Sequence, residues 1–118
     1  MMKVLLVDPV YNPGTIPPNI PLSKIAAGLM SCGIEVDTED FVRPDCENND
    51  LSFFRVAEAD FIKDIQQKVS DCDVVYITTG TGNELKPYPI YPRVLTISKA
   101  IKRTKNVKVI VGGALINL

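Results

Sequence analysis

The sequence of 118 residues has the length of one domain, and 46% of its residues are hydrophobic and 23% charged. Its 13 basic and 14 acidic side chains leave a net charge of −1, which gives no electrostatic footprint for nucleic acid. No apolar run approaches the roughly 18 residues that a membrane-spanning helix needs. These totals predict a cytoplasmic domain over residues 1–118 that binds neither nucleic acid nor membrane.

The cysteines and the lack of histidine narrow the possible chemistry. Cys32, Cys46 and Cys72 form no CxxC pair, so we expect reduced thiols rather than a zinc site. Without histidine, the chain lacks the commonest general base and any Ser-His or Cys-His pair. We therefore assign no catalytic residue and no metal ligand in this chain.

The N-terminal segment predicts a buried strand, a long loop and a helix. Lys3–Asp8 is a short, mostly apolar run, typical of a strand buried on both faces. Pro9–Ile20 contains four prolines and one glycine, which excludes a helix and predicts a rigid loop. A helix is expected from Pro21 to a left-handed Gly33, with an apolar face made by Leu22, Ile25, Ala26 and Leu29.

The next part of the chain predicts an edge strand, a polar connection and a long helix. Ile34–Thr38 alternates apolar and charged residues, as a strand with one wetter face does. In the connection over residues 39–52, the acids Asp40, Asp45 and Glu47 indicate a solvated loop rather than a metal cluster, because no EF-hand spacing is present. The helix is expected over Leu51–Val69, with a buried stripe made by Phe54, Ala57, Phe61, Ile62, Ile65 and Val69.

The second half repeats the order of strand, loop and helix. Asp73–Thr79 predicts another strand buried on both faces, and it opens into a loop rich in glycine and proline. Pro92 can start a third helix. Six bases and no acid lie between Arg93 and Lys108, and they predict a solvated face that complements the helix dipole. The inner face of this helix is assigned to Val94, Leu95, Ile97, Ser98 and Ile101.

The last predicted strand is Val107–Val111, which ends in Gly112 and Gly113. These glycines either let another group come close to the backbone or make a tight turn, and the sequence leaves both readings open. Ala114–Leu118 resembles the start of another helix.

This element order predicts an α/β fold of the Rossmann/flavodoxin-like type, a three-layer sandwich with a parallel sheet in the order 2-1-3-4. A fifth strand–helix unit is expected but not present, so we expect the chain to be the front part of a larger polypeptide. The open edge of the fourth strand would then permit a homodimer. The loops after strands one, three and four meet at the carboxyl edge, where open α/β sheets bind ligands.

Several segments together resemble the N-terminal cobalamin-binding domain of radical S-adenosylmethionine enzymes. They are Lys3–Pro9 with its proline loop, Ala26–Leu29, Gly33–Val36, Asp73–Thr79 and Val109–Gly113. The resemblance implies a base-off corrinoid held without a histidine ligand. The contacts it implies are Pro9, Tyr11, Asn12, Pro13, Gly14, Thr79, Gly80, Thr81, Gly82, Gly112 and Gly113.

The resemblance also implies a parent enzyme, a radical methyltransferase or a related enzyme. Its C-terminal radical S-adenosylmethionine domain would carry S-adenosylmethionine and a [4Fe-4S] cluster. This chain alone is expected to bind the corrinoid and to catalyse nothing.

Three alternatives stay open. A flavodoxin-like flavin or nucleotide binder would hold phosphate with Thr79–Asn83, although that loop follows the first strand in flavodoxins. A self-contained transferase or hydrolase has only Asp8 as a plausible base. A non-catalytic docking or structural domain is the main competitor. A receiver-type signalling domain is disfavoured, because Thr78 and Thr79 stand where it needs an acid.

Overall fold

The computed structural model describes residues 2–12, 20–42, 51–79 and 90–112, and the side chains of residues 2–9, 22–41, 58–79 and 93–112. Strands and helices alternate along the chain, as the sequence predicts. In order they are β1 (Lys3–Asn12), α1 (Ile20–Ser31), β2 (Glu35–Val42), α2 (Leu51–Val69), β3 (Val74–Thr78), α3 (Ile90–Thr104) and β4 (Lys108–Gly112).

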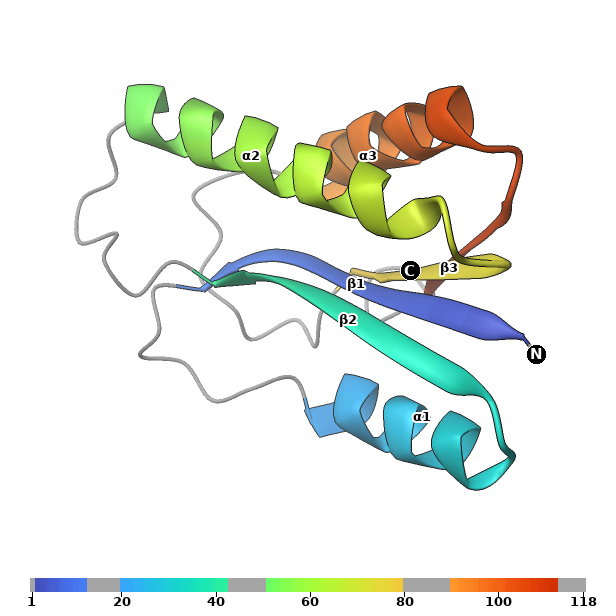
Figure 1. Ribbon diagram of the computed structural model, residues 1–118. Helices are drawn as coiled ribbons and strands as arrows, with labels where there is room; N and C mark the ends of the chain where they lie inside the picture. The colour runs from blue at the N-terminus through green and yellow to red at the C-terminus, as the bar shows by residue number, and fades with distance from the viewer. Residues whose placement is uncertain (1, 13–19, 43–50, 80–89, 113–118) are drawn as a thin grey trace.

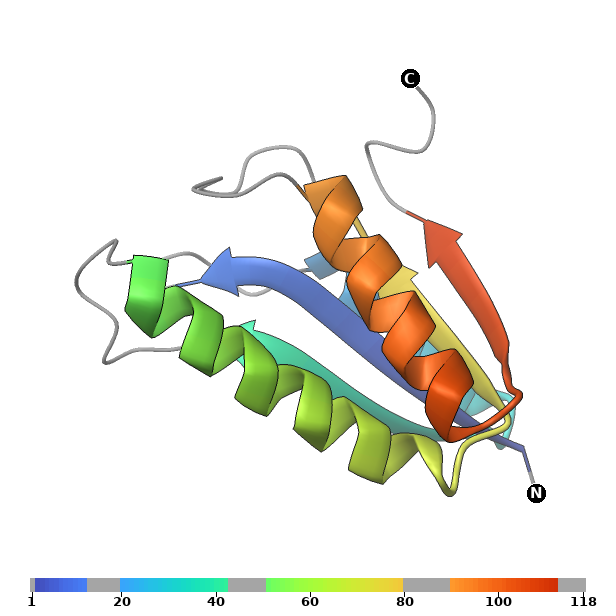
Figure 2. The same ribbon diagram turned by 90° about the horizontal axis from the view of Figure 1, so that it is seen from above.

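The four strands form one parallel sheet in the order β2-β1-β3-β4. Helix α1 covers one face, while α2 and α3 lie side by side on the other (Figures 1 and 2). This arrangement confirms the predicted α/β fold of the Rossmann/flavodoxin-like type. Among the described residues, no helix is both long and apolar enough to cross a membrane.

Strand β1 is longer than the sequence predicts, because Pro9–Asn12 continue it instead of starting the loop. Its pairing with β2 is regular up to Asp8, which lies opposite Asp40, and resumes only where Asn12 lies opposite Val42. Pro9 therefore falls in an irregularity of the ladder, where its missing N–H costs no regular hydrogen bond. The prediction that no helix begins at Pro9 is correct, but Pro9 does not end the strand.

Strand β2 is also longer, since it runs to Val42 rather than ending at Thr38. Phe41 is fully buried, and its ring stacks on that of Phe61 in α2 with the centroids 4.9 Å apart. The acids around Phe41 predict a polar connection, but residues 39–42 belong to β2. The burial of Phe41 against Phe61 stabilises this part of the strand. Asp40 is consequently a strand residue, while Asp45 and Glu47 lie outside the described residues.

The larger core cluster fills the space between the sheet and helices α2 and α3. Three of the six stripe residues predicted for α2 are buried there, namely Phe61, Ile65 and Val69. Ile62 packs against them, and the side chains of Phe54 and Ala57 lie outside the described residues. From α3 come Val94, Ile97 and Ile101.

The prediction for Leu95 is wrong, because 59% of that residue is exposed on the outer side of α3. The sequence placed Leu95 on the inner face of α3 because it is apolar. Leu95 precedes Ile97 by two positions, which is about 200° around a helix, so it turns away from the face that Ile97 occupies.

A smaller core cluster lies on the opposite face of the sheet, beneath α1. Val4 and Leu6 of β1 and Leu22 of α1 are buried in it, and Leu29, Ile34, Tyr76 and others pack against them. A single helix, α1, thus covers this face of the sheet, whereas two helices, α2 and α3, cover the other face (Figure 1).

The C-terminal end of α1 is closed by Gly33, as predicted. Gly33 has a φ of 79°, the left-handed conformation that a side chain strains. Its N–H donates to the Met30 carbonyl at 3.0 Å, and the Ile34 N–H donates to the Leu29 carbonyl at 3.1 Å. This pair of bonds is a Schellman motif, which satisfies carbonyls that the helix end would leave unpaired.

We expect Gly33→Ala to lower the free energy of unfolding by about 1 kcal/mol, because alanine is strained at positive φ. Gly28→Ala is the matched control, since Gly28 lies within α1 and an added Cβ would meet nothing within 4 Å. That substitution should raise the free energy of unfolding by about 0.5–1 kcal/mol. Urea denaturation measures both, and effects of the same sign would contradict the assignment.

Candidate functional site

The candidate site is the carboxyl edge of the sheet, where the strand order changes direction. From β1 the chain crosses to β2 on one side through α1, and from β2 it crosses back to β3 and β4 through α2 and α3 (Figure 2). The ends of β1 and β3 are therefore neighbours whose connections leave on opposite faces. Such a switch point is the usual place for a ligand in an open α/β sheet.

Two buried threonines end the central strand β3 at this edge. Thr78 closes the ladder opposite Gly112, and Thr79 follows it with only 2% of its surface exposed. The Thr79 N–H donates to the Gly112 carbonyl at 2.7 Å. Because this amide already donates within the sheet, it is not available to a phosphate group. A flavin or nucleotide would have to be bound by the amides of residues after Thr79, which weakens that alternative.

Gly112, at the end of β4, is approached closely by the side chain of Tyr76. A Cβ built on Gly112 would overlap the Tyr76 hydroxyl and lie 3.0 Å from the ring carbon Cζ. For Gly112, the structure confirms close approach to the backbone, whereas a tight turn at Gly113 lies outside the described residues. The approaching group belongs to the protein itself, in the neighbouring strand.

We expect Gly112→Ala to lower the free energy of unfolding by about 1–3 kcal/mol, since the methyl group has no room beside Tyr76. Tyr76→Phe removes the hydroxyl that overlaps, so Gly112→Ala should cost less in that background. Denaturation of both single variants and the double variant gives the interaction energy. Additive effects would show that Tyr76 does not set the requirement for glycine.

The other residues that the resemblance assigned to the site divide into two groups. Pro9 is buried within β1, and Tyr11 and Asn12 belong to the last part of that strand rather than to a loop. The remaining assigned residues lie outside the described residues: Pro13, Gly14, Gly80, Thr81, Gly82 and Gly113. The edge thus brings together β1, Thr79 and Gly112.

Arg93 is a buried cation that the sequence analysis missed. The run of bases from Arg93 to Lys108 predicts a solvated position for this side chain, but only 6% of the residue is exposed. Its guanidinium carbon lies 4.9 Å from the Phe41 ring centroid, and its Nε lies 3.8 Å from Oε2 of Glu58 in α2. The interactions tie the first turn of α3 to β2 and α2.

A signal for the position of Arg93 was present in the helical spacing. Arg93 precedes Ile97 by four residues and Ile101 by eight, so the period of 3.6 places it on the buried stripe. The charge of the side chain outweighed this spacing in the prediction. A partnered arginine beside an aromatic ring can be buried despite its charge.

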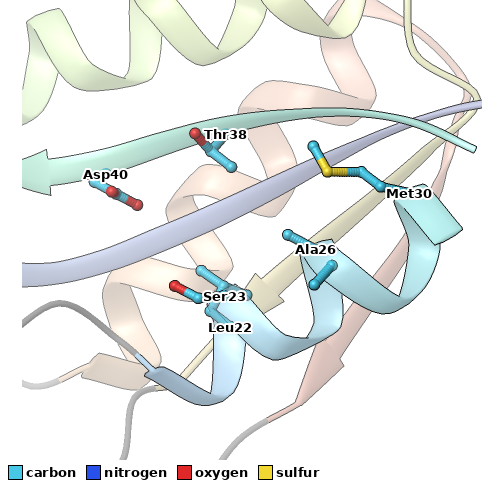
Figure 3. Close-up of a pocket in the computed structure, with 7 residues that line it drawn as sticks. Leu22, Ser23, Ala26, Met30, Thr38 and Asp40 are labelled. Atoms are coloured by element: carbon cyan, nitrogen blue, oxygen red, sulfur yellow. The ribbon is translucent and has the colours of Figure 1, made fainter.

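A cleft lies between α1 and the edge strand β2 (Figure 3). Its volume is about 310 Å³, and it is lined by Leu22, Ser23, Ala26, Ala27, Met30, Thr38 and Asp40. Burial raises the pKa of Asp40 above its usual value of 3.8, and the charge of Lys68 opposes this with a smaller effect. The cleft thus combines apolar side chains with the hydroxyls of Ser23 and Thr38, and the carboxyl group of the exposed residue Asp40 lies at its rim.

The raised pKa of Asp40 predicts a specific pH dependence. The native state binds this proton more tightly than the unfolded state, so the contribution of Asp40 to stability is complete below pH 3.8 and is lost as pH rises through the native pKa. Asp40→Asn should therefore gain stability relative to the parent protein as pH rises from about 3 to 7. Asp64→Asn, at an exposed position of α2, is the control. A difference that is constant across this range would contradict the prediction.

Asp8 and Asp40 lie opposite each other in the pairing of β1 and β2. Among the described residues, no group of three or more histidine, cysteine or acidic side chains is placed to hold a metal ion. Cys32 and Cys72 are free thiols, the first exposed and the second buried. Burial raises the pKa of the Cys72 thiol, which disfavours the reactive thiolate.

Comparison with known proteins identifies no family for this chain. No protein-family model matches the chain, and no curated protein or solved structure shows significant similarity to it.

Proposed function

We propose that this chain is a ligand-binding module that holds a base-off corrinoid across the carboxyl edge of its sheet. The observation that carries the proposal is the strand order β2-β1-β3-β4, which makes the ends of β1 and β3 neighbours at a switch point. The choice of a corrinoid rests on the sequence resemblance. The fold supports the place of binding, and the resemblance supports the ligand.

The side chains described at this edge are compatible with a broad, flat ligand. Thr78 and Thr79 are small and buried at the end of β3, and Gly112 has no side chain. Pro9 is buried in the central strand β1. A macrocycle can therefore approach the ends of β1 and β3 over small residues, while the Tyr76 side chain borders the approach to Gly112. The absence of histidine agrees with binding that needs no histidine ligand.

In this proposal, Pro9, Thr79 and Gly112 support the ring from the strand ends, and the other residues of the resemblance surround it. The bound corrinoid would supply methyl-transfer or related radical chemistry. The residues of this chain would bind and orient it, while the C-terminal domain of a parent enzyme would contribute S-adenosylmethionine and a [4Fe-4S] cluster. Free thiols and a near-neutral net charge agree with a cytoplasmic location.

The test is a visible-absorption titration of the purified chain with hydroxocobalamin and with methylcobalamin, followed by gel filtration to detect co-elution. We expect saturable binding that Gly80→Trp weakens at least tenfold, because a bulky side chain at an assigned contact would block the ring. Asn106→Trp is the matched control, since Asn106 is exposed and lies two residues before β4 at the amino edge. Flavin mononucleotide is titrated in parallel.

The outcomes separate the candidate functions. Equal loss of binding in both tryptophan variants would place the corrinoid elsewhere or indicate general damage to the fold. Binding of flavin mononucleotide but not of cobalamin would favour the flavodoxin-like alternative. If neither cofactor binds, the corrinoid proposal is wrong, and the docking-domain reading replaces it.

One observation favours a docking domain as the second candidate. The face of the sheet beneath α1 leaves Ile110 of β4 41% exposed, and Ile25 of α1 is also exposed. β4 is the edge strand of the described sheet, and a homodimer formed along it stays a prediction. An unpaired strand edge with an exposed apolar side chain can take up a partner strand.

A further inference from the structure

The cleft between α1 and β2 has features of a binding site that is separate from the carboxyl edge. We propose that it binds a small organic cation, a primary ammonium group on a short apolar chain. The ammonium would pair with the Asp40 carboxylate, and the chain would lie against Ala26 and Met30 (Figure 3). This proposal does not depend on the corrinoid.

The first argument is the charge of the cleft. In β2, Thr38 and Asp40 line the cleft, whereas Asp37 and Glu39 turn to the other face of the sheet. There Lys68 lies 2.7 Å from Oε2 of Glu39 and 3.5 Å from Oδ1 of Asp37. The described residues provide no ion pair for Asp40, so a ligand cation is the complementary partner for its carboxylate.

The second argument is the shape of the cleft. Helix α1 presents small side chains toward β2 at Ser23, Ala26 and Ala27, so the helix and the edge strand do not fill the space between them. Met30 forms one wall, with 58% of its surface exposed. Its flexible thioether can adjust to an apolar chain of varying shape. A volume of about 310 Å³ is at the small end for ligand sites, which favours an amine of a few carbon atoms.

The third argument is selectivity. A neutral alcohol of the same shape would gain the apolar contact without the charge-assisted hydrogen bond, and a carboxylate would be repelled by Asp40. The favoured chemistry is therefore an alkylammonium. It is found both in free amines and in lysine side chains.

The test is a titration of the ¹⁵N-labelled chain, followed by amide chemical shifts, with n-butylammonium, n-butanol and butyrate at constant ionic strength. We expect saturable shifts at Thr38, Asp40 and Ala26 with n-butylammonium, and affinities at least about tenfold lower for the other two. Nα-acetyl-lysine methylamide is titrated in the same way. Tighter binding of the free amine identifies a small molecule as the source, and tighter binding of the lysine derivative identifies a protein side chain.

Two pairs of variants make the result specific. Asp40→Asn should weaken n-butylammonium binding by about tenfold or more, whereas Asp64→Asn on α2 should leave it unchanged. Ala26→Leu should also weaken it, by filling the cleft, whereas Ala59→Leu at an exposed site of α2 should not. The amide spectrum of each variant reports whether it remains folded, and the two variants in the cleft act through different chemistry.

Three results would overturn the proposal. They are the absence of saturable shifts with n-butylammonium, equal affinity for n-butanol, and unchanged n-butylammonium affinity in either Asp40→Asn or Ala26→Leu.

Discussion

The structure depends on the burial of strand β1 on both faces. Leu5 and Val7 face the core beneath α2 and α3, and Leu6 faces the core beneath α1, all without exposed surface. The strand also pairs with β2 on one side and β3 on the other. Since β2 lies on one side of β1 and β3 on the other, the carboxyl end of β1 is the switch point of the sheet. The location of the candidate site therefore depends on the central position of β1.

The two faces of the sheet are built differently, and this difference shapes both candidate sites. On one face, α2 and α3 enclose a large core, which the contacts of Phe41, Phe61 and Arg93 close near the end of β2. On the other face, α1 alone packs on the sheet and leaves the cleft with Asp40 beside it. The face under α2 and α3 holds the larger buried cluster, while the face under α1 leaves accessible surface.

The contacts at the carboxyl edge disfavour a flavin phosphate more than they disfavour a flat ring. The Thr79 amide already bonds to Gly112, and Tyr76 occupies the space beside Gly112, so neither group is available for phosphate in the way that a flavin site needs. A ring that rests on the strand ends requires fewer such donors. The cleft has different chemistry, because an exposed carboxylate lies beside the apolar side chains of Ala26 and Met30, and it therefore suits a different class of ligand.

The sequence by itself determined the element types and the parallel sheet, since hydrophobic period, glycine and proline positions and the crossover rule are local or topological constraints. The strand order followed from the flavodoxin-like type that this element order indicates. It also determined the left-handed Gly33. Only the tertiary structure decided the lengths of β1 and β2, the burial of Arg93 and the role of Gly112. Each depends on a residue distant in sequence: Asn12 on Val42, Arg93 on Phe41 and Gly112 on Tyr76. The helical spacing indicates that Arg93 lies on the buried stripe, but no local pattern identifies these distant partners, and the partner sets the free energy of burying a charge or extending a strand.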